Sequence, residues 1–202
     1  MIAIIDYGMG NIHSVQKALE IMQAQTKVTS SPGDIMSSDK LVLPGVGAFD
    51  DAMKQLNKGN LLSVIKEEIK NNKPFLGICL GMQLLFEASE EAMQAKGMGL
   101  LKGVVKKFRN EKGLKVPHMG WNQLNIKNKN CPLLKGLEDK VAVYFCHSYY
   151  PEPEDEAIVA TTTDYGIDFA SSVWKDNIYG VQFHPEKSQE IGLKILRNFV
   201  NL

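Results

Sequence analysis

The chain has 202 residues, with 23 Lys and Arg against 23 Asp and Glu, so its formal net charge is zero. This balance argues against a generic nucleic-acid binder or a protein that lies on an anionic membrane, because both normally need a basic excess. With 44% hydrophobic and 23% charged residues, the composition is that of an ordinary globular protein. The length favours a single domain over residues 1–202.

The N-terminus and the cysteines give an expectation about location. The chain opens with the apolar stretch Met1–Ile5, without the basic segment that begins a signal peptide. No apolar run approaches the ~18–20 residues of a membrane span. The three cysteines, Cys79, Cys131 and Cys146, form neither a disulfide framework nor a C-x-x-C zinc pair. We therefore expect a soluble cytoplasmic protein that needs no metal or cofactor and binds neither membrane nor nucleic acid.

Strand and helix patterns alternate through the first half of the chain. Short apolar runs predict buried strands, and apolar residues at helical spacing predict amphipathic helices. The predicted strands are Ile2–Ile5, Lys40–Leu43 (ended by Pro44-Gly45) and Pro74–Cys79; one helix carries Ile12, Val15, Leu19 and Met22, the next Leu61, Leu62, Ile65 and Ile69, and a third begins in Met82–Phe86. Such alternation is typical of a parallel sheet covered by helices.

The second half is richer in strand patterns and ends in a helix. The predicted strands are Val141–His147, Ala157–Thr163, Phe169–Trp174 and Ile178–Phe183. A final helix starts near Ser188 as N-cap, has Glu190 in its first turn, and buries Ile191, Ile195 and Phe199. The sequence therefore predicts an α/β fold whose mostly parallel sheet is flanked by helices and carries an antiparallel extension.

Three turns that contain glycine fall at the carboxyl ends of predicted strands, where α/β sheets bind ligands. They are Gly8–Gly10, Pro44–Gly47 and the segment around Cys79. The last reads Gly77-Ile78-Cys79-Leu80-Gly81, which is the G-x-S-x-G nucleophile elbow with Cys in the serine position. A sharp strand-to-helix turn exposes the nucleophile, and the new helix N-terminus favours a thiolate. Cys79 is therefore the candidate nucleophile, although a cysteine at a strand end is also a common small core residue.

A thiolate needs a proton partner, and His184 is the candidate. It ends a strand pattern and precedes Pro185, which favours an extended backbone. In an extended segment, residues i and i+2 face the same way, so Glu186 suits the role of holding the imidazole. Alone, His184-Pro185-Glu186 also reads as an exposed turn.

The other cysteines and His13 are weaker candidates. Cys146 is followed by His147, but neighbours on a strand point to opposite faces and cannot easily pair. Cys131 precedes Pro132 in a polar loop, where we expect no catalytic role. His13 opens a helix face and is expected to be solvated.

These motifs together resemble the class I (triad) glutamine amidotransferases. The stretches that carry the resemblance are Leu43–Phe49, Gly77–Gln83, His147–Tyr149 and Gly180–Ser188. Two more stretches, Asp6–Asn11 and Pro117–Asn122, resemble the glutaminase subunits of imidazole glycerol phosphate synthase in particular. The motifs run from residue 6 to residue 188, so the resemblance covers essentially the whole chain.

The resemblance implies glutamine hydrolysis to glutamate and ammonia, with Cys79 as nucleophile, His184 as base and Glu186 as the residue that orients His184. It implies an oxyanion hole formed at Leu80 and Val46. The positions that match substrate-binding residues of the family are Gly47, Gln83, Ser148 and Tyr149; for Gln83, plain helix surface is the alternative.

The resemblance also implies a partner, a cyclase subunit with a (β/α)8 barrel that receives the ammonia within a heterodimer and makes imidazole glycerol phosphate for histidine biosynthesis. Asn11, Trp121 and Lys187 match positions at that contact, although Trp121 could equally be core. A paralogous class I glutaminase that feeds a different synthase stays as an alternative.

Two rival classes explain less. A dinucleotide-binding module would need a third glycine at His13, and no acidic residue ends the strand-like run Lys27–Thr29. Another cysteine hydrolase, or a non-catalytic protein with an elbow, would share Cys79 but would not explain Glu186 two residues after His184.

Overall fold

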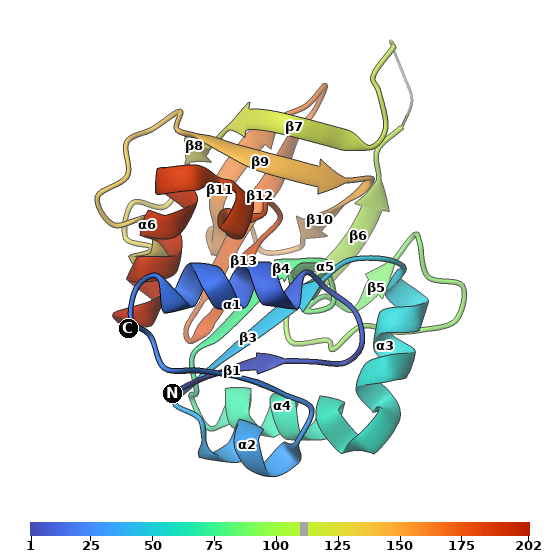
Figure 1. Cartoon of the computed structure of the whole chain (residues 1–202). Coiled ribbons are helices and arrows are strands. Elements are labelled where there is room, and N and C mark those ends of the chain that lie inside the picture. The colour runs from blue at the N-terminus through green and yellow to red at the C-terminus, as the bar shows by residue number, and fades with distance from the viewer. Residues whose placement is uncertain (110–112) are drawn as a thin grey trace.

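A computed structural model describes residues 1–109 and 113–202, and an eight-stranded sheet forms its centre (Figure 1). The strand order is β2-β1-β3-β4-β13-β12-β11-β8. The bounds are β1 Ile2–Ile5, β2 Thr26–Thr29, β3 Lys40–Gly45, β4 Phe75–Cys79, β8 Asn125–Ile126, β11 Val159–Asp164, β12 Asp168–Lys175 and β13 Ile178–Val181.

The sheet has a parallel part and an antiparallel part. Neighbours from β2 through β13 all pair parallel, whereas β12, β11 and β8 continue the sheet antiparallel. The parallel strands are buried on both faces, which is why β1, β4 and β13 read as continuous apolar runs rather than alternating ones. The predicted mostly parallel sheet with an antiparallel extension is confirmed.

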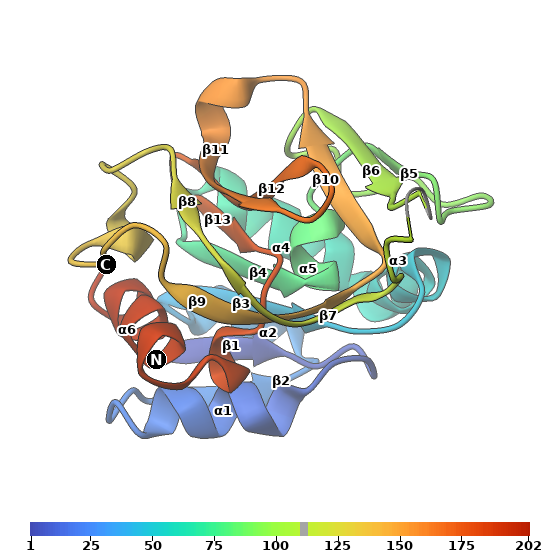
Figure 2. The same cartoon turned by 90° about the horizontal axis from the view of Figure 1, so that it is seen from above.

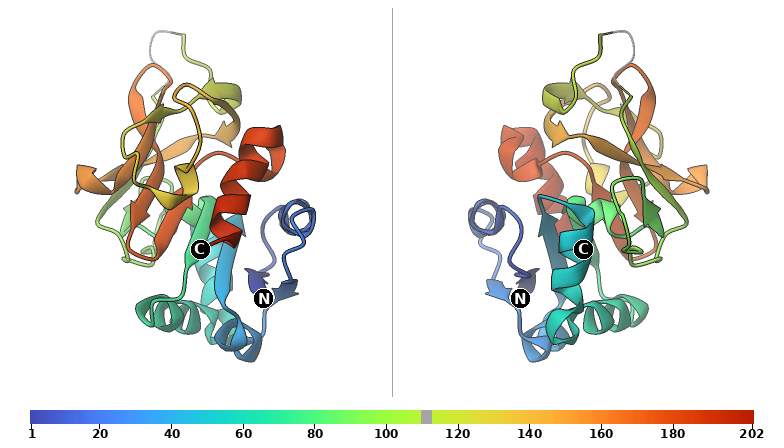
Figure 3. Two further views of the ribbon diagram at one scale, coloured as in Figure 1. Left: turned by 90° about the vertical axis from the view of Figure 1, so that its left-hand side faces the viewer. Right: turned by 90° about the vertical axis from the view of Figure 1, so that its right-hand side faces the viewer.

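Two layers of helices cover the parallel strands (Figure 3). Ile2 and Ile4 of β1 pack in one apolar cluster with residues of α1 (Ile12–Glu20) and α6 (Gln189–Val200). Ala3 and Ile5 point the other way, into a second cluster with α2 (Pro32–Ser37), α3 (Phe49–Asn57) and α4 (Leu61–Lys70). The two clusters follow from the period-2 alternation of a strand. No helix in residues 1–109 and 113–202 is long and apolar enough to cross a membrane.

Two small sheets flank the central one. β10 (Tyr149–Pro153), β6 (Gly103–Lys107) and β5 (Ala88–Ser89) form the first, and β7 (His118–Gln123) pairs antiparallel with β9 (Ala142–His147) in the second. β9 contacts α6 and the 3-10 turn η4 (Pro185–Lys187), while β7 contacts β11. Figure 2 looks down on this β7–β9 pair. The other 3-10 turns are η1 Lys58–Asn60, η2 Pro132–Leu134 and η3 Glu156–Ile158.

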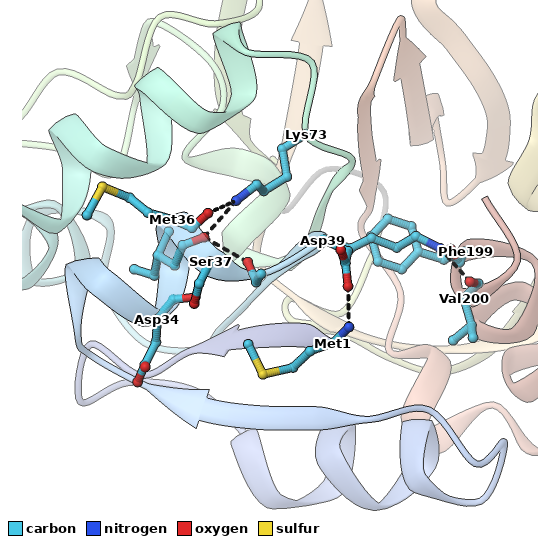
Figure 4. A network of polar contacts seen from close by, with 11 residues as sticks. Met1, Asp34, Met36, Ser37, Asp39, Lys73, Phe199 and Val200 are labelled. Atoms are coloured by element: carbon cyan, nitrogen blue, oxygen red, sulfur yellow. Dashed lines mark hydrogen bonds and ion pairs between the residues drawn. The ribbon is translucent and has the colours of Figure 1, made fainter.

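A polar network closes the amino ends of the parallel strands (Figure 4). The N-terminal amine pairs with Asp39, and Lys40 donates to the last carbonyls of α6. Lys73 donates to the carbonyl oxygens of Ile35 and Met36, each at 2.8 Å. Cations at helix C-terminal carbonyls are favourable. These contacts occupy the end of the sheet opposite to the one that carries the glycine turns.

Two local expectations were wrong. The helix expected from Met82 is α5, which begins at Leu80 directly after Cys79 and ends at Gln83. β3 does not stop at Leu43: it continues through Pro44, which lies opposite Ile78, to Gly45, which lies opposite Cys79. Proline is tolerated at this position because β3 pairs with β1 only as far as Val42, so no ladder hydrogen bond on that side is lost at Pro44.

Close packing of α5 against β3 requires glycine. A Cβ added to Gly81 would lie 1.9 Å from the carbonyl oxygen of Leu43, so the backbone would have to move. We expect Gly81→Ala to lower the free energy of unfolding by about 1–3 kcal/mol, the usual cost of forced overpacking, in urea titrations. The control is Gly33→Ala in α2, where the added Cβ has its nearest neighbour at 3.7 Å. Equal stability of the two variants would contradict this account.

Candidate active site

Cys79 sits in the turn between β4 and α5. Its backbone has φ 54° and ψ −111°, a strained conformation for a residue with a side chain. A Cβ on Gly77 would lie 2.5 Å from the carbonyl oxygen of Gly81, so the turn closes only with glycine at position 77. The geometry is that of the nucleophile elbow that the sequence predicts.

His184 and Glu186 form a buried pair beside Cys79. The Nδ1 atom of His184 lies 2.9 Å from Oε1 of Glu186, and the two side chains are 5% and 1% exposed. Pro185 begins the 3-10 turn η4, and this turn, rather than the extended segment expected from the sequence, brings Glu186 back to His184. Since Nδ1 faces Glu186, Nε2 is the nitrogen of His184 left to face Cys79, and the two residues line the same pocket.

The environment of His184 favours its charged form. Burial lowers its pKa, but the contacts with Cys79 and Glu186 outweigh burial and raise the pKa to about 10. Glu186 Oε2 has no hydrogen-bond partner, so the carboxylate acts on His184 through a single oxygen. The site is therefore built to hold an imidazolium next to the sulfur.

A pocket of about 340 Å³ opens over Cys79 and His184. This volume lies in the range of small-molecule sites. The structure brings seven further residues predicted from the sequence to its walls: Val46, Gly47, Leu80, Gln83, Ser148, Tyr149 and Lys187. Four lining residues were not predicted: Glu91, Pro117, Cys146 and His147.

The register of β3 and β4 explains why Val46 and Leu80 are neighbours. Gly45 lies directly opposite Cys79, so the next residue of each strand, Val46 and Leu80, leaves the sheet at the same level. Val46 is 43% exposed and precedes Gly47, whose φ is 95°. Val46, Gly47 and Leu80 therefore line the same pocket as Cys79.

Gln83 lies in the protein interior, at 4% exposure, and not on a helix surface. Its Nε2 donates to the carbonyl oxygen of Tyr149 and to Oε1 of Gln182, both at 3.0 Å. Gln182 in turn places Nε2 at 3.6 Å from Sγ of Cys79. Sequence reasoning did not single out Gln182, because a glutamine inside a strand pattern carries no signal of its own.

His147 in the pocket wall and His118 next to it form a pair of neutral histidines. His147 donates from Nδ1 to the carbonyl oxygen of Tyr149 at 2.8 Å, and its Nε2 lies 2.9 Å from Nδ1 of His118. Burial lowers the pKa of His147 to about 3 and that of His118 to about 4. His147 therefore is not the base of a Cys146–His147 pair, as strand alternation had indicated.

Glu91 is the acidic residue of the pocket wall. Its Oε2 accepts a hydrogen bond from the backbone N–H of Phe49, the first residue of α3, at 3.0 Å. Burial raises its pKa, while that hydrogen bond acts in the opposite direction. Glu91 lies in a charged loop that follows β5, where neither periodicity nor spacing distinguishes it from the neighbouring acidic residues.

Residues matched to a partner contact lie beside this pocket. Trp121 is 50% exposed on β7, so it is not a core residue, and Met119 on the same strand is 61% exposed. The ring centroids of Trp121 and Tyr144 lie 6.2 Å apart, and Nζ of Lys187 lies 5.8 Å from the centroid of the Tyr144 ring. Asn11 precedes α1, a helix that contacts η4.

The remaining candidates fall outside the chemistry. Cys131 lies in the expected loop, directly before η2, but its side chain is buried in the apolar core, and burial raises its pKa to about 11. His13 is exposed on α1, as expected. Cys146 contributes a carbonyl oxygen 4.0 Å from Sγ of Cys79. Within the described part of the chain, no group of three or more His, Cys, Asp or Glu could hold a metal ion.

A match to a family model places these features in a known class. The model "Glutamine amidotransferase class-I" matches residues 3–202, and the chain therefore belongs to this family. Proteins named imidazole glycerol phosphate synthase subunit HisH are similar along nearly the whole chain. The one from Syntrophotalea carbinolica is 52% identical over 98% of this chain and 98% of its own length. The one from Gloeothece citriformis is 52% identical over 100% of this chain and 95% of its own length.

Solved structures agree on the fold. A structure of PurLQS from Thermotoga maritima has a TM-score of 0.78 at 21% identity and covers 99% of this chain and 97% of its own. A crystal structure of a glutamine amidotransferase has a TM-score of 0.76 at 15% identity, with 99% of both chains covered. At these identities the likeness concerns the fold alone.

The neutral His147 contributes stability that is lost in acid. The pKa of His147 falls from 6.5 to about 3 on folding. Below pH 6.5 the unfolded chain therefore binds a proton at this histidine that the folded chain does not bind. Between pH 7 and pH 5 this linkage lowers the free energy of unfolding by about 2 kcal/mol. We expect the free energy of unfolding to fall by about 2 kcal/mol less in His147→Gln than in the wild type between pH 7 and pH 5. Urea titrations at the two pH values measure this difference. His13→Gln is the matched control, and an unchanged pH dependence in His147→Gln would contradict the assignment.

Proposed function

We propose that this chain hydrolyses glutamine to glutamate and ammonia through a thioester on Cys79. The observation that carries the proposal is that Cys79 and His184 lie in the wall of a substrate-sized pocket, with Glu186 buried behind His184 and 2.9 Å from its Nδ1. Membership of the class I glutamine amidotransferase family supports it. The whole chain, residues 1–202, then acts as one glutaminase domain without metal or cofactor.

In the first half of the reaction, the Sγ–H proton of Cys79 moves to Nε2 of His184. The sulfur attacks the carboxamide carbon of glutamine, and the C–N bond breaks as His184 returns the proton to the departing ammonia. In the second half, water gives a proton to His184, its oxygen bonds to the thioester carbon, and the C–S bond breaks as His184 returns the proton to the sulfur of Cys79. Glu186 holds the imidazole in one orientation and stabilises its charged form.

Both tetrahedral intermediates carry an oxyanion, which we assign to the backbone N–H groups of Leu80 and Val46. Gly47, Gln83, Ser148 and Tyr149 surround the substrate in this proposal. Both N–H bonds of the Gln83 amide are used within the protein, so its Oε1 is the atom offered to glutamine. The carboxylate of Glu91 adds a charge complementary to the substrate α-ammonium.

Ammonia must reach an acceptor, and the relatives are named as subunits of imidazole glycerol phosphate synthase. We propose that this chain forms a heterodimer with a cyclase subunit, a (β/α)8 barrel, and supplies it with ammonia for histidine biosynthesis. Asn11, Trp121 and Lys187 form the contact. The three free cysteines suit the reducing cytoplasm, where we place the enzyme. The alternative partner is a different synthase fed by a paralogous glutaminase.

The nucleophile can be identified by substitution of two neighbouring cysteines. We expect Cys79→Ala to abolish glutaminase turnover while the thermal unfolding curve stays cooperative. Cys146→Ala keeps the backbone carbonyl that faces the sulfur, so we expect it to retain most activity. Glutamate release in the presence of the cyclase is the measurement. If Cys79→Ala retains turnover, or if only Cys146→Ala loses it, Cys79 is not the nucleophile.

The partner contact can be tested on two tryptophans. Exposed Trp residues are frequent anchors of interfaces, and truncation of such an anchor often costs 2 kcal/mol or more. We expect Trp121→Ala to raise the dissociation constant of the cyclase complex at least about tenfold in calorimetric titrations. Trp174→Ala, on a strand of the central sheet, is the control. Equal affinities for the two variants would remove Trp121 from the contact, and no binding of the histidine-pathway cyclase by the wild type would favour a different synthase.

A further inference from the structure

The buried amide of Gln182 contacts the reacting sulfur. Gln182 is fully buried, directly follows β13, and its backbone N–H donates to the carbonyl oxygen of Ser171 at 2.9 Å. Its side chain bridges two groups: Nε2 lies 3.6 Å from Sγ of Cys79, and Oε1 accepts from Nε2 of Gln83 at 3.0 Å. The catalytic steps assigned to Cys79, His184 and Glu186 make no use of this contact.

The orientation of the Gln182 amide is dictated by one carbonyl oxygen. The oxygen of Tyr149 can only accept hydrogen bonds, so the Gln83 atom 3.0 Å away from it must be Nε2. That same nitrogen donates its second N–H to Gln182, whose facing atom must then be the acceptor Oε1. If the Gln182 amide were reversed, its NH₂ group would face the NH₂ group of Gln83, and neither could accept a hydrogen bond. The NH₂ group of Gln182 is therefore held against the sulfur of Cys79.

The second lone pair of that carbonyl oxygen is also used. His147 donates to the oxygen of Tyr149 from Nδ1 at 2.8 Å, and its Nε2 lies 2.9 Å from Nδ1 of His118. Because Nδ1 of His147 is the donor, its Nε2 accepts from His118. The network thus has one direction, and Gln83 cannot turn its amide without breaking a buried hydrogen bond.

We propose that Gln182 is a catalytic residue whose side-chain N–H donates a hydrogen bond to the thiolate of Cys79, with Gln83 as the residue that positions it. This inference rests on the proposed glutaminase function for its chemistry. A donor on sulfur favours the charged form over the neutral thiol. It acts when the Sγ–H proton has moved to His184, and again when the C–S bond of the thioester breaks and its electron pair returns to sulfur.

The first test removes the donor. Gln182→Leu keeps much of the side-chain volume but has no N–H to offer. We expect alkylation of Cys79 by iodoacetamide at pH 7, followed by peptide mapping, to slow about tenfold, in the range expected when a hydrogen bond to a charged group is lost. The pH of half-maximal alkylation should rise by about one unit, since one unit corresponds to tenfold.

The second test distinguishes donation from mere packing. Gln182→Glu keeps an acceptor for Gln83, but its other oxygen donates to sulfur only when the carboxyl is protonated. We expect its alkylation rate, relative to that of the wild type at the same pH, to increase as the pH falls. Gln182→Leu should show the opposite trend. A purely structural role for Gln182 predicts no such reversal.

The control is the same amide-to-leucine change at the other end of β13. Asn177 donates from Nδ2 to the carbonyl oxygens of Ile69 and Lys73, each at 2.8 Å, and does not line the pocket. Asn177→Leu should leave the alkylation profile of Cys79 unchanged. The proposal is overturned if Gln182→Leu alkylates with the wild-type profile, or if Asn177→Leu shifts the profile equally.

Failure of this proposal can be separated from failure of the proposed function. Alkylation by iodoacetamide needs neither glutamine nor the cyclase, so it reports on the sulfur alone. A shifted profile in Gln182→Leu together with no glutamine turnover by the wild type would refute the glutaminase and keep the hydrogen bond. If the wild type and Gln182→Leu both turn over glutamine normally and their alkylation profiles coincide, the role of Gln182 is refuted and the glutaminase function is kept.

Discussion

The strained backbone of Cys79 is the constraint on which the site depends. A φ of 54° is unfavourable for cysteine, and conformations of this kind cost on the order of 1–3 kcal/mol. The strain is sustained because β4 lies in the middle of the sheet, where Phe75, Leu76 and Ile78 are buried in the clusters on its two faces. Because the turn is this sharp, α5 starts at the very next residue and its first N–H lies next to the sulfur.

The register of β13 on β4 assembles the rest of the chemistry. Val181 lies opposite Ile78, so the next residue along β13, Gln182, emerges level with Cys79. Two residues further, the chain reaches His184, and η4 then turns Glu186 back toward the imidazole. A single parallel pairing thus delivers Gln182, the proposed base His184 and Glu186 to one side of the proposed nucleophile, from a segment more than a hundred residues away in sequence.

Much of this arrangement could be predicted from residue patterns, because the elements concerned are determined by residues close together in sequence. Continuous apolar runs identified β1 and β4, helical spacing identified α1 and α4, and the glycines around Cys79 identified the elbow, because each pattern reflects short-range geometry. Other features depend on tertiary contacts. The expectation of an extended His184–Glu186 segment missed η4, and the β10-β6-β5 sheet carries pairings of residues far apart in sequence.

The unpredicted residues of the site share a physical origin. Glu91 and His147 reach the pocket wall, and Gln182 reaches the sulfur of Cys79, through long-range packing. Their roles depend on the direction of their hydrogen bonds, which no spacing rule encodes. The β7–β9 pair shows the same point. The buried His118 lies opposite the buried His147 at one end of the pair, while the exposed Trp121 lies opposite Tyr144 farther along it. The exposed face of the pair carries Trp121, and its buried face carries the neutral His118 and His147. The proposed partner contact and the substrate pocket therefore share one two-stranded sheet.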